Sequence, residues 1–356
     1  MKKQLFMLML LVLVCTTASA QRKLAGYAVG FYNLENLFDY THDEGKNDYE
    51  FLPDGSYHWN EMKYTHKLHN MSRVLAEMGT DKIPDGCAFI GVSEVENDHV
   101  LTDLVAQPSL AARNFKFCHI EGPDRRGIDC ALLYNPKYYK VNNVKLVPYV
   151  PELAKDSTFK TRGFLTVSGE LAGEHVDVIV CHWPSRFSGS FYRETAGREV
   201  RAVKDSLLKD DPNVKVFIMG DMNDDPTNKS MYDCLGAKED IDKVKADEMY
   251  NPWYNTLVKG HTGTLKYQGN WNLFDQIVMT PNLLNQNGKK DFSTLKFISH
   301  QIFRRDYLFQ ETGKYKGNTK RTTAGGVWLD GYSDHLPTVV YLGPKGDCPW
   351  QADAAA

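Results

Sequence analysis

Short apolar runs bounded by glycine, proline, asparagine or aspartate recur along the chain, and they predict strands more often than helices. The runs are rich in valine, isoleucine, phenylalanine and tyrosine, which fit a pleated and half-buried surface. On this pattern we expect strands at residues 27–32, 87–92, 115–120, 128–134, 141–150, 163–170, 176–181, 214–219, 274–279, 294–299 and 338–342.

Three segments carry a helical pattern instead. In 60–78 the apolar side chains follow three- and four-residue steps, at Leu68, Met71, Leu75 and Met78. A shorter helix is expected over 98–106. A third is expected over 191–209, where apolar residues gather on one face and arginines lie elsewhere.

Many strands with few helices predict an α/β (α+β) four-layer sandwich, in which two mixed β-sheets pack face to face and are flanked by helices. The length alone would allow two domains. No linker, repeat or low-complexity stretch divides the chain, so we expect one domain over 21–345 and a C-terminal tail over 346–356.

The first twenty residues have the pattern of a signal peptide. Two lysines precede an apolar run over 5–14, and small residues at 18–20 would form a cleavage site. A retained membrane helix is disfavoured because the run is short. Lipidation of Cys15 is disfavoured because Val14 stands where a small residue is usual. We therefore expect a soluble mature chain without a transmembrane segment, exported to the periplasm or outside the cell.

Composition narrows the class of protein. Apolar residues make up 42% and charged residues 24% of the 356 residues, which excludes a coiled coil, a collagen-like repeat and a disordered polyanion. The formal charge of −3 becomes −5 once the two lysines of the leader are removed. That balance argues against a protein that coats nucleic acid non-specifically, because such proteins are usually strongly basic.

Six cysteines remain in the expected mature chain: Cys87, Cys118, Cys130, Cys181, Cys234 and Cys348. Their spacing matches neither a CxxC pair nor a zinc finger. Most lie in or beside apolar strand-like runs, where cysteine serves as a small buried hydrophobe. An exported protein can also form disulfides, so both structural thiols and disulfides remain open, and the pairing cannot be read from the sequence.

Polar side chains follow several predicted strands where a structural strand would not need them. They are Asn33, Glu35, Glu94, His182, Asp221, Asn223, Asp275, Asp334 and His335. Each one alone is explained by a turn, a cap or a solvated strand end. Brought together, their carboxylates would suit a hard cation and their imidazoles would suit proton transfer.

In this order, these stretches resemble the endonuclease/exonuclease/phosphatase superfamily, typified by pancreatic-type deoxyribonuclease, and within it the exported bacterial nuclease-like branch. The stretches are YNLENLF at 32–38, EVEN at 94–97, RGIDCALLY at 126–134, HWPSR at 182–186, GDMNDDP at 220–226, GT at 263–264 with DQI at 275–277, and SDHLP at 333–337. The resemblance spans nearly the whole mature chain. Its fold agrees with the two-sheet sandwich expected from the strand pattern.

The resemblance implies a site for Mg²⁺ (or Mn²⁺). Glu94 would be the main metal ligand, and Asn33 would contact the phosphate and support the metal. Asp334 would be a second acid on the metal side. Glu35 lies where some members have an acidic neighbour of the metal, although aspartate is more common there in the repair nucleases.

The same resemblance implies the catalytic groups. Asp221 would orient or deprotonate the attacking water, with Asn223 as its companion. His335 would contact the phosphate and Asp275 would orient it. His182 matches a second histidine, either a general acid or a phosphate contact.

Three further residues are weaker candidates for phosphate contacts: Arg126, Arg186 and Tyr134. Tyr134 is equally well explained as a packed strand residue.

This set suits hydrolysis of a phosphate ester by direct, metal-assisted attack of water, since a bound cation offsets the repulsion between an anionic ester and hydroxide. No cysteine or serine constellation offers a covalent nucleophile. Nucleic acid is the favoured substrate because basic residues recur near the predicted site and because 303–321 mixes basic with aromatic residues. A solvated loop also explains that segment. The alternatives are a phosphodiesterase or phosphatase for a lipid, inositol phosphate or other small phosphoester, and a catalytically silent binding protein.

Overall fold

Two large mixed sheets form the centre of the computed structural model, which describes residues 26–343 and all their side chains except those of 152 and 154. The six-stranded sheet has the order β14 (Lys296–Ile302), β17 (Thr338–Gly343), β1 (Tyr27–Leu37), β2 (Cys87–Val95), β4 (Asp129–Tyr134), β3 (Lys116–His119). The seven-stranded sheet has the order β5 (Tyr139–Val147), β6 (Phe164–Leu171), β7 (Glu174–His182), β8 (Lys215–Asp221), β13 (Asp275–Met279), β10 (Met249–Tyr250), β9 (Ala237–Lys238).

All the strands expected from the apolar runs lie in these two sheets, and the predicted architecture is confirmed. The pattern missed only short strands. These are β9 and β10 at one sheet edge, and two small hairpins, β11 (Leu265–Tyr267) with β12 (Asn270–Asn272) and β15 (Thr323–Ala324) with β16 (Val327–Trp328). Strands of two or three residues carry too little alternation to show a period.

The three expected helices are α2 (Glu61–Glu77), α3 (Asp98–Ala106) and α5 (Ser190–Asp210). Asn60 and Asn97 cap the first two, because their side chains accept from the amides of Lys63 and Val100 at 3.1 Å. The shorter helical elements are α4 (Pro108–Ala111), α6 (Trp253–Val258), the 3₁₀ turns η1 (Tyr49–Phe51), η2 (Pro151–Ala154), η4 (Pro281–Leu283) and η5 (Asp306–Leu308), and the π-helical turn η3 (Ser230–Leu235).

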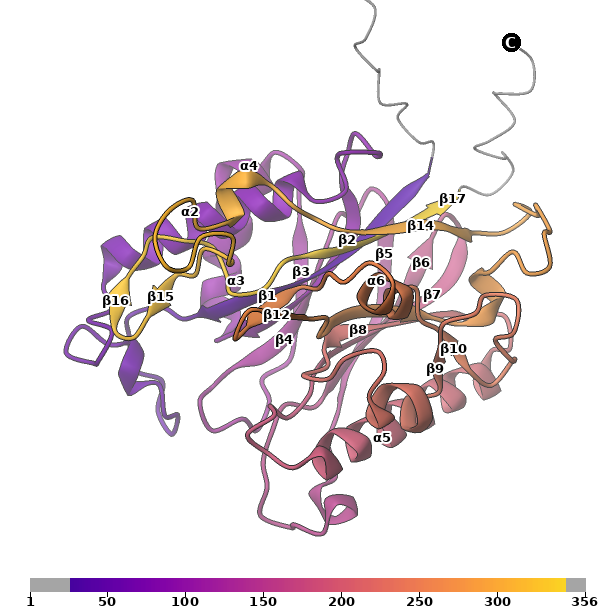
Figure 1. Ribbon diagram of the computed structural model, residues 1–356, viewed down its shortest axis with the longest axis horizontal. Helices are drawn as coiled ribbons and strands as arrows, with labels where there is room; N and C mark the ends of the chain where they lie inside the picture. Colours follow the sequence, from indigo (N-terminus) through magenta and orange to yellow (C-terminus); the bar gives the residue numbers. More distant parts are fainter. Residues whose placement is uncertain (1–25, 344–356) are drawn as a thin grey trace, which may run out of the picture.

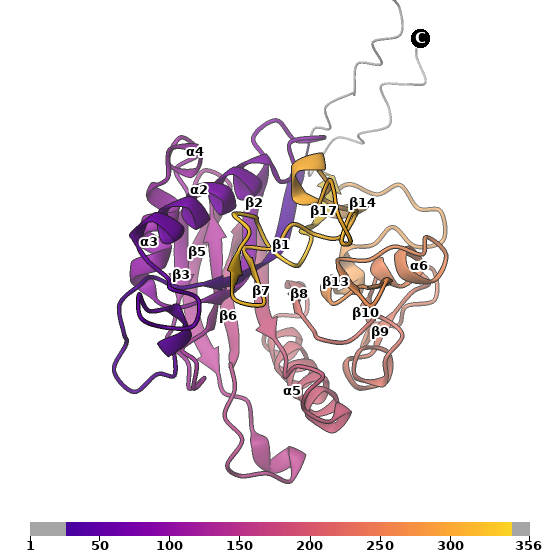
Figure 2. The same cartoon turned by 60° about the vertical axis from the view of Figure 1, so that its left-hand side comes forward.

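Three apolar clusters hold the layers together. One lies between the sheets and joins Phe31 and Phe89 of the first sheet to Phe217 and Met219 of the second. Another packs α2, α3 and α4 on the outer face of the first sheet, and the last packs α5 on the second. Figures 1 and 2 show these helices on opposite sides of the paired sheets, which gives the four layers.

The strand register brings the polar ends of several strands to one edge. Strands β7 and β8 are parallel and pair His182 with Asp221, while β13 runs antiparallel to β8 and pairs Asp275 with Asp221. In the other sheet β1 and β2 are parallel. A register shift between Ser93 and Val95 takes Glu94 out of the ladder with β4.

The five described cysteines are free thiols, and all are buried: Cys87, Cys118, Cys130, Cys181 and Cys234. Within residues 26–343 they are therefore packing residues and form no disulfides. The expected signal peptide, the C-terminal tail and Cys348 lie outside the described residues. No helix within 26–343 combines the length and the apolar character that crossing a bilayer requires.

Candidate active site

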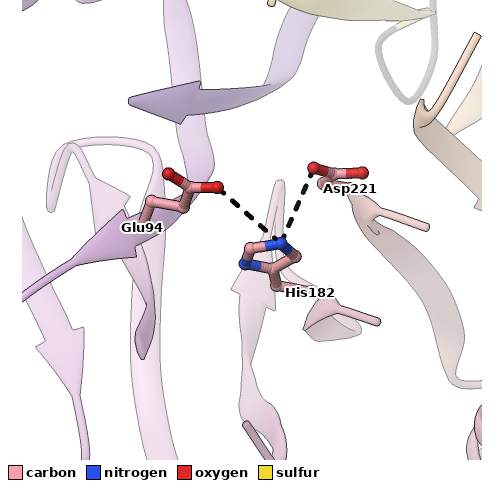
Figure 3. Close-up of side chains that lie close together, drawn as sticks. All are labelled: Glu94, His182 and Asp221. Carbon is pink, nitrogen blue, oxygen red and sulfur yellow. Dashed lines mark ion pairs between the residues drawn. The ribbon is translucent and has the colours of Figure 1, made fainter. Parts of the chain in front are cut away.

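Glu94, His182 and Asp221 meet at the edge where β2, β7 and β8 end (Figure 3). The His182 Nε2 atom lies 3.8 Å from Glu94 Oε1 and 3.7 Å from Asp221 Oδ2. One imidazole thus faces carboxylates from both sheets. These are residues that the sequence predicted for the site.

Asn33 of β1 joins the two sheets at this point. Its Nδ2 donates to Glu94 Oε1 at 3.2 Å and to Asp221 Oδ2 at 3.0 Å. The amide is itself held, because the backbone N–H of Glu35 donates to Asn33 Oδ1 at 2.8 Å. Asn33 therefore sets the spacing of the two acids, and its side-chain oxygen is already occupied by a backbone donor.

Asp221 is buried, and its pKa is raised to about 7 because burial disfavours the charged form; His335 opposes this shift, while Asp275 and Glu94 add to it. A carboxyl group that titrates near neutral pH is a much better base than a free aspartate. Asn223 holds it in place: its backbone N–H donates to Asp221 Oδ1 at 2.9 Å, and its Nδ2 donates to the carbonyl of Trp183 at 3.0 Å.

The two histidines of the site have opposite pKa shifts. Burial lowers the pKa of His182 well below its ordinary value, and the charges of Arg162, Arg126 and His335 lower it further. Burial also acts to lower the pKa of His335, but Asp275 and the neighbouring acids outweigh it and hold that pKa well above the ordinary value. His182 is thus a neutral imidazole, which favours the predicted phosphate contact over the general acid, while His335 is the protonated group.

Asp275 and Asp334 place His335. The His335 Nδ1 atom lies 2.7 Å from Asp275 Oδ2, and its Nε2 lies 3.8 Å from Asp221 Oδ2 and 3.9 Å from Asp334 Oδ1. With Nδ1 engaged by Asp275, the Nε2 hydrogen points into the site. It can therefore donate to a bound anion.

Glu35 is held by hydrogen bonds and an ion pair beside Asp334. Its Oε1 accepts from Arg321 Nε at 2.8 Å, and its Oε2 accepts from the backbone N–H of Thr322 at 2.7 Å. Both carboxylate oxygens of Glu35 thus accept hydrogen bonds, as do those of Glu94, which accept from Asn33 Nδ2 and from the backbone N–H of Asn36, so the predicted place of Glu35 beside the metal stays a prediction. Arg321 also pairs with Asp334, whose Oδ2 lies 3.1 Å from Arg321 Nη2. The other oxygen of Asp334, Oδ1, lies 3.9 Å from His335 Nε2.

Sequence reasoning missed Lys67, which is fully buried in α2 beside this network. Its ammonium donates to Thr322 Oγ1 and to the carbonyl of Tyr332. Burial lowers the pKa of Lys67 to about 8, although Glu35 and Asp334 oppose this. A lysine within a helical pattern gives no sign that it is buried, so no sequence signal would have found it.

Arg186 has several partners within the protein. Its guanidinium donates to the carbonyl of Asn223 at 3.1 Å and to Asp225 Oδ2 at 3.0 Å. It also donates to Asn228 at 3.1 Å and Asn272 at 3.3 Å, and it lies 4.4 Å from the ring centre of Phe274. The side chain thus ties the segment after β7 to the segment after β8, and its predicted phosphate contact stays a prediction.

Tyr134 does not lie at the site. Strands β2 and β4 are antiparallel, and Tyr134 pairs with Phe89, five residues before Glu94, or roughly 16 Å along the strand. Its ring packs edge-on against Tyr139. Its prediction as a phosphate contact is therefore wrong, and the packed strand tyrosine is the correct interpretation. Arg126 is exposed, and its positive charge helps to lower the pKa of His182. Its predicted phosphate contact stays a prediction.

The basic and aromatic segment 303–321 is largely committed to the fold. Arg305 pairs with Asp81 at 2.8 Å, Arg321 pairs with Glu35, and Tyr307 donates to Glu77 at 2.8 Å. Arg304 lies 4.9 Å from the ring centre of Trp271. Three of the cations that suggested phosphate binding thus already have partners within the protein.

A comparison with known protein families matches residues 28–344 to the model described as the endonuclease/exonuclease/phosphatase family. The chain belongs to this family. The superfamily resemblance noted in the sequence is therefore confirmed; nothing in the comparison bears on an exported branch. Members of the family are phosphoester hydrolases that generally depend on a divalent metal.

Solved structures of this fold cover nearly the whole chain. The D. rerio TDP2 complexed with a single-strand DNA product is 12% identical, with a TM-score of 0.53, and the match covers 90% of this chain and 99% of that one. A mannosyl-6-phosphatase of Bacteroides thetaiotaomicron is 14% identical, with a TM-score of 0.54 and coverage of 89% and 99%. ANGEL2, a 2',3'-cyclic phosphatase, is 13% identical, with a TM-score of 0.55 and coverage of 90% and 95%. At these identities the likeness establishes the fold. No curated protein matches the chain.

The donors at the site of this family member fit a divalent cation. Glu94, His182 and Asp221 place one ligand atom each within 4.8 Å of one another. Asp334 Oδ1 lies 3.9 Å from His335 Nε2. Carboxylate oxygens are the ligands that Mg²⁺ and Mn²⁺ prefer, and Mg²⁺ usually takes only one or two of them. The Nε2 atom of His182 faces the two acids, while its Nδ1 atom is buried without a hydrogen-bond partner in the described structure.

Proposed function

We propose that this protein is a divalent-metal-dependent phosphodiesterase that hydrolyses its substrate by direct attack of water, with no covalent intermediate. The observation that carries the proposal is the meeting of Asp221, whose pKa is near 7, with one neutral and one protonated histidine at an edge shared by both sheets. A base and an acid poised side by side at neutral pH are what hydrolysis of a phosphoester requires.

Each group has a separate task in this reaction. Asp221 takes the proton of the attacking water, and Asn33 and Asn223 hold that carboxylate in position. His335, oriented by Asp275, donates through Nε2 to a phosphoryl oxygen, and neutral His182 contacts the same group. Glu94 and Asp334 would hold the metal. When bound, Mg²⁺ or Mn²⁺ neutralises charge on the phosphoryl oxygens and stabilises the leaving oxygen.

The substrate we propose is nucleic acid, cut by an exported enzyme in the periplasm or outside the cell. The HWPSR sequence at 182–186 and the signal-peptide pattern at 1–20 support this assignment. A related fold has been solved with a single-strand DNA product, which makes this substrate class a reasonable first test.

A small or lipid phosphoester is the second candidate, and one observation favours it. Arg186, Arg305 and Arg321 are all paired with acids within the protein, so the basic surface available to a long polyanion is smaller than the sequence suggested. A mannosyl-6-phosphatase shares the fold. The difference between the candidates lies in the substrate; the chemistry at Asp221 is the same.

The test is one assay panel on the purified protein with Mg²⁺, Mn²⁺ or a chelator. The substrates are single-stranded and duplex DNA, RNA, sphingomyelin, inositol phosphates, a sugar phosphate and a chromogenic phosphodiester. Asp221→Asn should abolish every activity, and Asp240→Asn, which removes a surface carboxylate paired with Lys243, should not. If a small or lipid phosphoester is turned over while nucleic acid stays intact, the second candidate substrate replaces nucleic acid in the proposal. A trapped phospho-enzyme would overturn the direct attack of water, and no turnover at all would favour a binding protein.

A further inference from the structure

The segment between β7 and α5, residues 183–189, is joined to the loop that follows Asp221 by hydrogen bonds and ion pairs. Arg193 binds it from within: Nη1 donates to the carbonyls of Ser185 at 2.9 Å and Ser188 at 3.1 Å, and Nε lies 2.9 Å from Asp224 Oδ2. Arg186 binds the same neighbouring loop through Asp225. Two arginines thus hold the middle and the C-terminal part of this segment.

Phe187 stands at the tip of this segment, with its ring entirely in solvent. Its relative exposure is 105%, the highest among the exposed large apolar side chains of the described structure, while Trp183 in the same segment is fully buried. A single exposed apolar residue is common on protein surfaces. Here, however, the carbonyls of Ser185 and Ser188, on either side of Phe187, both accept from Arg193.

The segment that carries the ring lies beside the loop that positions Asp221. Phe187 is five residues from His182, so their Cα atoms lie at most about 18 Å apart. The adjacent Arg186 donates to the carbonyl of Asn223, whose amide holds Asp221. Phe187 is thus carried by a segment joined directly to the loop that holds Asp221.

Cations surround the next exposed ring along the chain. Phe191, in the first turn of α5, has Lys155 and Arg198 each 5.8 Å from its ring centre. Exposed aromatic rings interleaved with cations suit a single strand, whose bases stack while its phosphates are neutralised. A neutral apolar ligand would gain no electrostatic attraction from these two cations.

We propose that Phe187 is a specificity residue that stacks on an unpaired base of a nucleic-acid substrate next to the cleaved phosphodiester. The inference rests on the proposed function, because it assumes that nucleic acid reaches the site. It predicts a preference for single-stranded over duplex substrate, which would depend on one side chain that takes no part in the chemistry. Stacking tolerates any base, so Phe187 favours an accessible base without selecting a sequence.

The experiment compares Phe187→Ala, Phe187→Trp and a control, Tyr49→Ala, which removes another exposed aromatic side chain, 57% exposed and outside the segment 183–189. With a single-stranded oligonucleotide, Phe187→Ala should raise KM by roughly 5- to 150-fold, the range expected for one stacked base, with kcat unchanged. Phe187→Trp and Tyr49→Ala should behave as the wild type. The chromogenic phosphodiester should be turned over equally by all four proteins, since it reports the catalytic groups alone.

Equilibrium binding of a labelled single strand in chelator separates this inference from the proposed function. If the chromogenic ester is turned over but Phe187→Ala binds and cuts the single strand as the wild type does, the inference is overturned and the enzyme remains. If nothing is turned over, a loss of strand binding in Phe187→Ala still supports the stacking role, and equal binding overturns it. Binding to anionic lipid vesicles that depends on Phe187, with none to the single strand, would assign the ring to a membrane surface and overturn the inference as well.

Discussion

His335 and Asp275 form a buried pair with Nδ1 of the imidazole 2.7 Å from Oδ2 of the carboxylate. The pair decides two properties of the site at once. It fixes which nitrogen of His335 faces the substrate, and it keeps the ring protonated at neutral pH against the effect of burial. Asp275 thus acts through His335, as a positioning residue.

Asp275→Asn should lower kcat by about 10²- to 10⁴-fold, the usual contribution of a general acid or base. The pKa of His335 is raised in the folded protein, so the protonated form persists until the pH rises through that value. Without the carboxylate, the alkaline limb of the profile of kcat/KM against pH should move to lower pH. A profile that keeps its position in the variant would assign the alkaline limb to another group.

Glu94→Gln should abolish binding of the divalent metal. For the wild-type protein, Mg²⁺ or Mn²⁺ at about a hundred times Kd should stabilise the fold by about 2.7 kcal/mol, which thermal melting detects without any assay of activity. The variant should show little of this increase, while Asp240→Asn should retain it. An unchanged metal-dependent rise in Tm in Glu94→Gln would place the ion elsewhere.

Arg186→Ala should destabilise the protein by about 1–2 kcal/mol, because it leaves Asp225 and the buried Asp224 with fewer partners. We expect kcat to fall as well, since the Asn223 carbonyl that supports the Asp221 loop loses its donor. The stability and kcat of Arg186→Lys should lie between those of the wild type and of Arg186→Ala, because an ammonium group cannot reproduce the planar, forked hydrogen bonding of a guanidinium. Wild-type stability combined with a raised KM would establish Arg186 as a phosphate contact.

Glu96→Gln should stabilise the protein at alkaline pH. Glu96 is buried, it accepts from the backbone N–H of Asp39 at 2.8 Å, and burial raises its pKa to about 9, with Asp39 and the nearby acids adding to the shift. The unfolded chain releases this proton near pH 4.3. The wild type should therefore lose stability as the pH rises from about 4.3 toward 9.

Chemical denaturation of both proteins at pH 5, 7 and 9 measures the effect of Glu96. The advantage of Glu96→Gln should be small at pH 5 and should grow with pH, since one unit of pKa shift corresponds to about 1.4 kcal/mol. A difference between the two proteins that stays constant across this range would show that Glu96 does not hold a proton in the fold.

The strands and helices were predictable because their signals are local. The period-two and 3.6-residue patterns, and the asparagines that cap α2 and α3, need only neighbouring residues to be read. Polar residues at strand ends also predicted Glu94, His182 and Asp221 as site residues. His182 and Asp221 meet because β7 and β8 are parallel neighbours, whereas Glu94 reaches them from the other sheet.

The tertiary structure alone decided which of the predicted groups are free to act. Arg321 and Glu35 are 286 positions apart in the sequence, yet the fold joins them in an ion pair at 2.8 Å. The antiparallel register of β2 and β4 sends Tyr134 away from Glu94. Opposite pKa shifts for His182 and His335 arise from burial and from neighbouring charges that the fold brings together, and no local pattern encodes such distances.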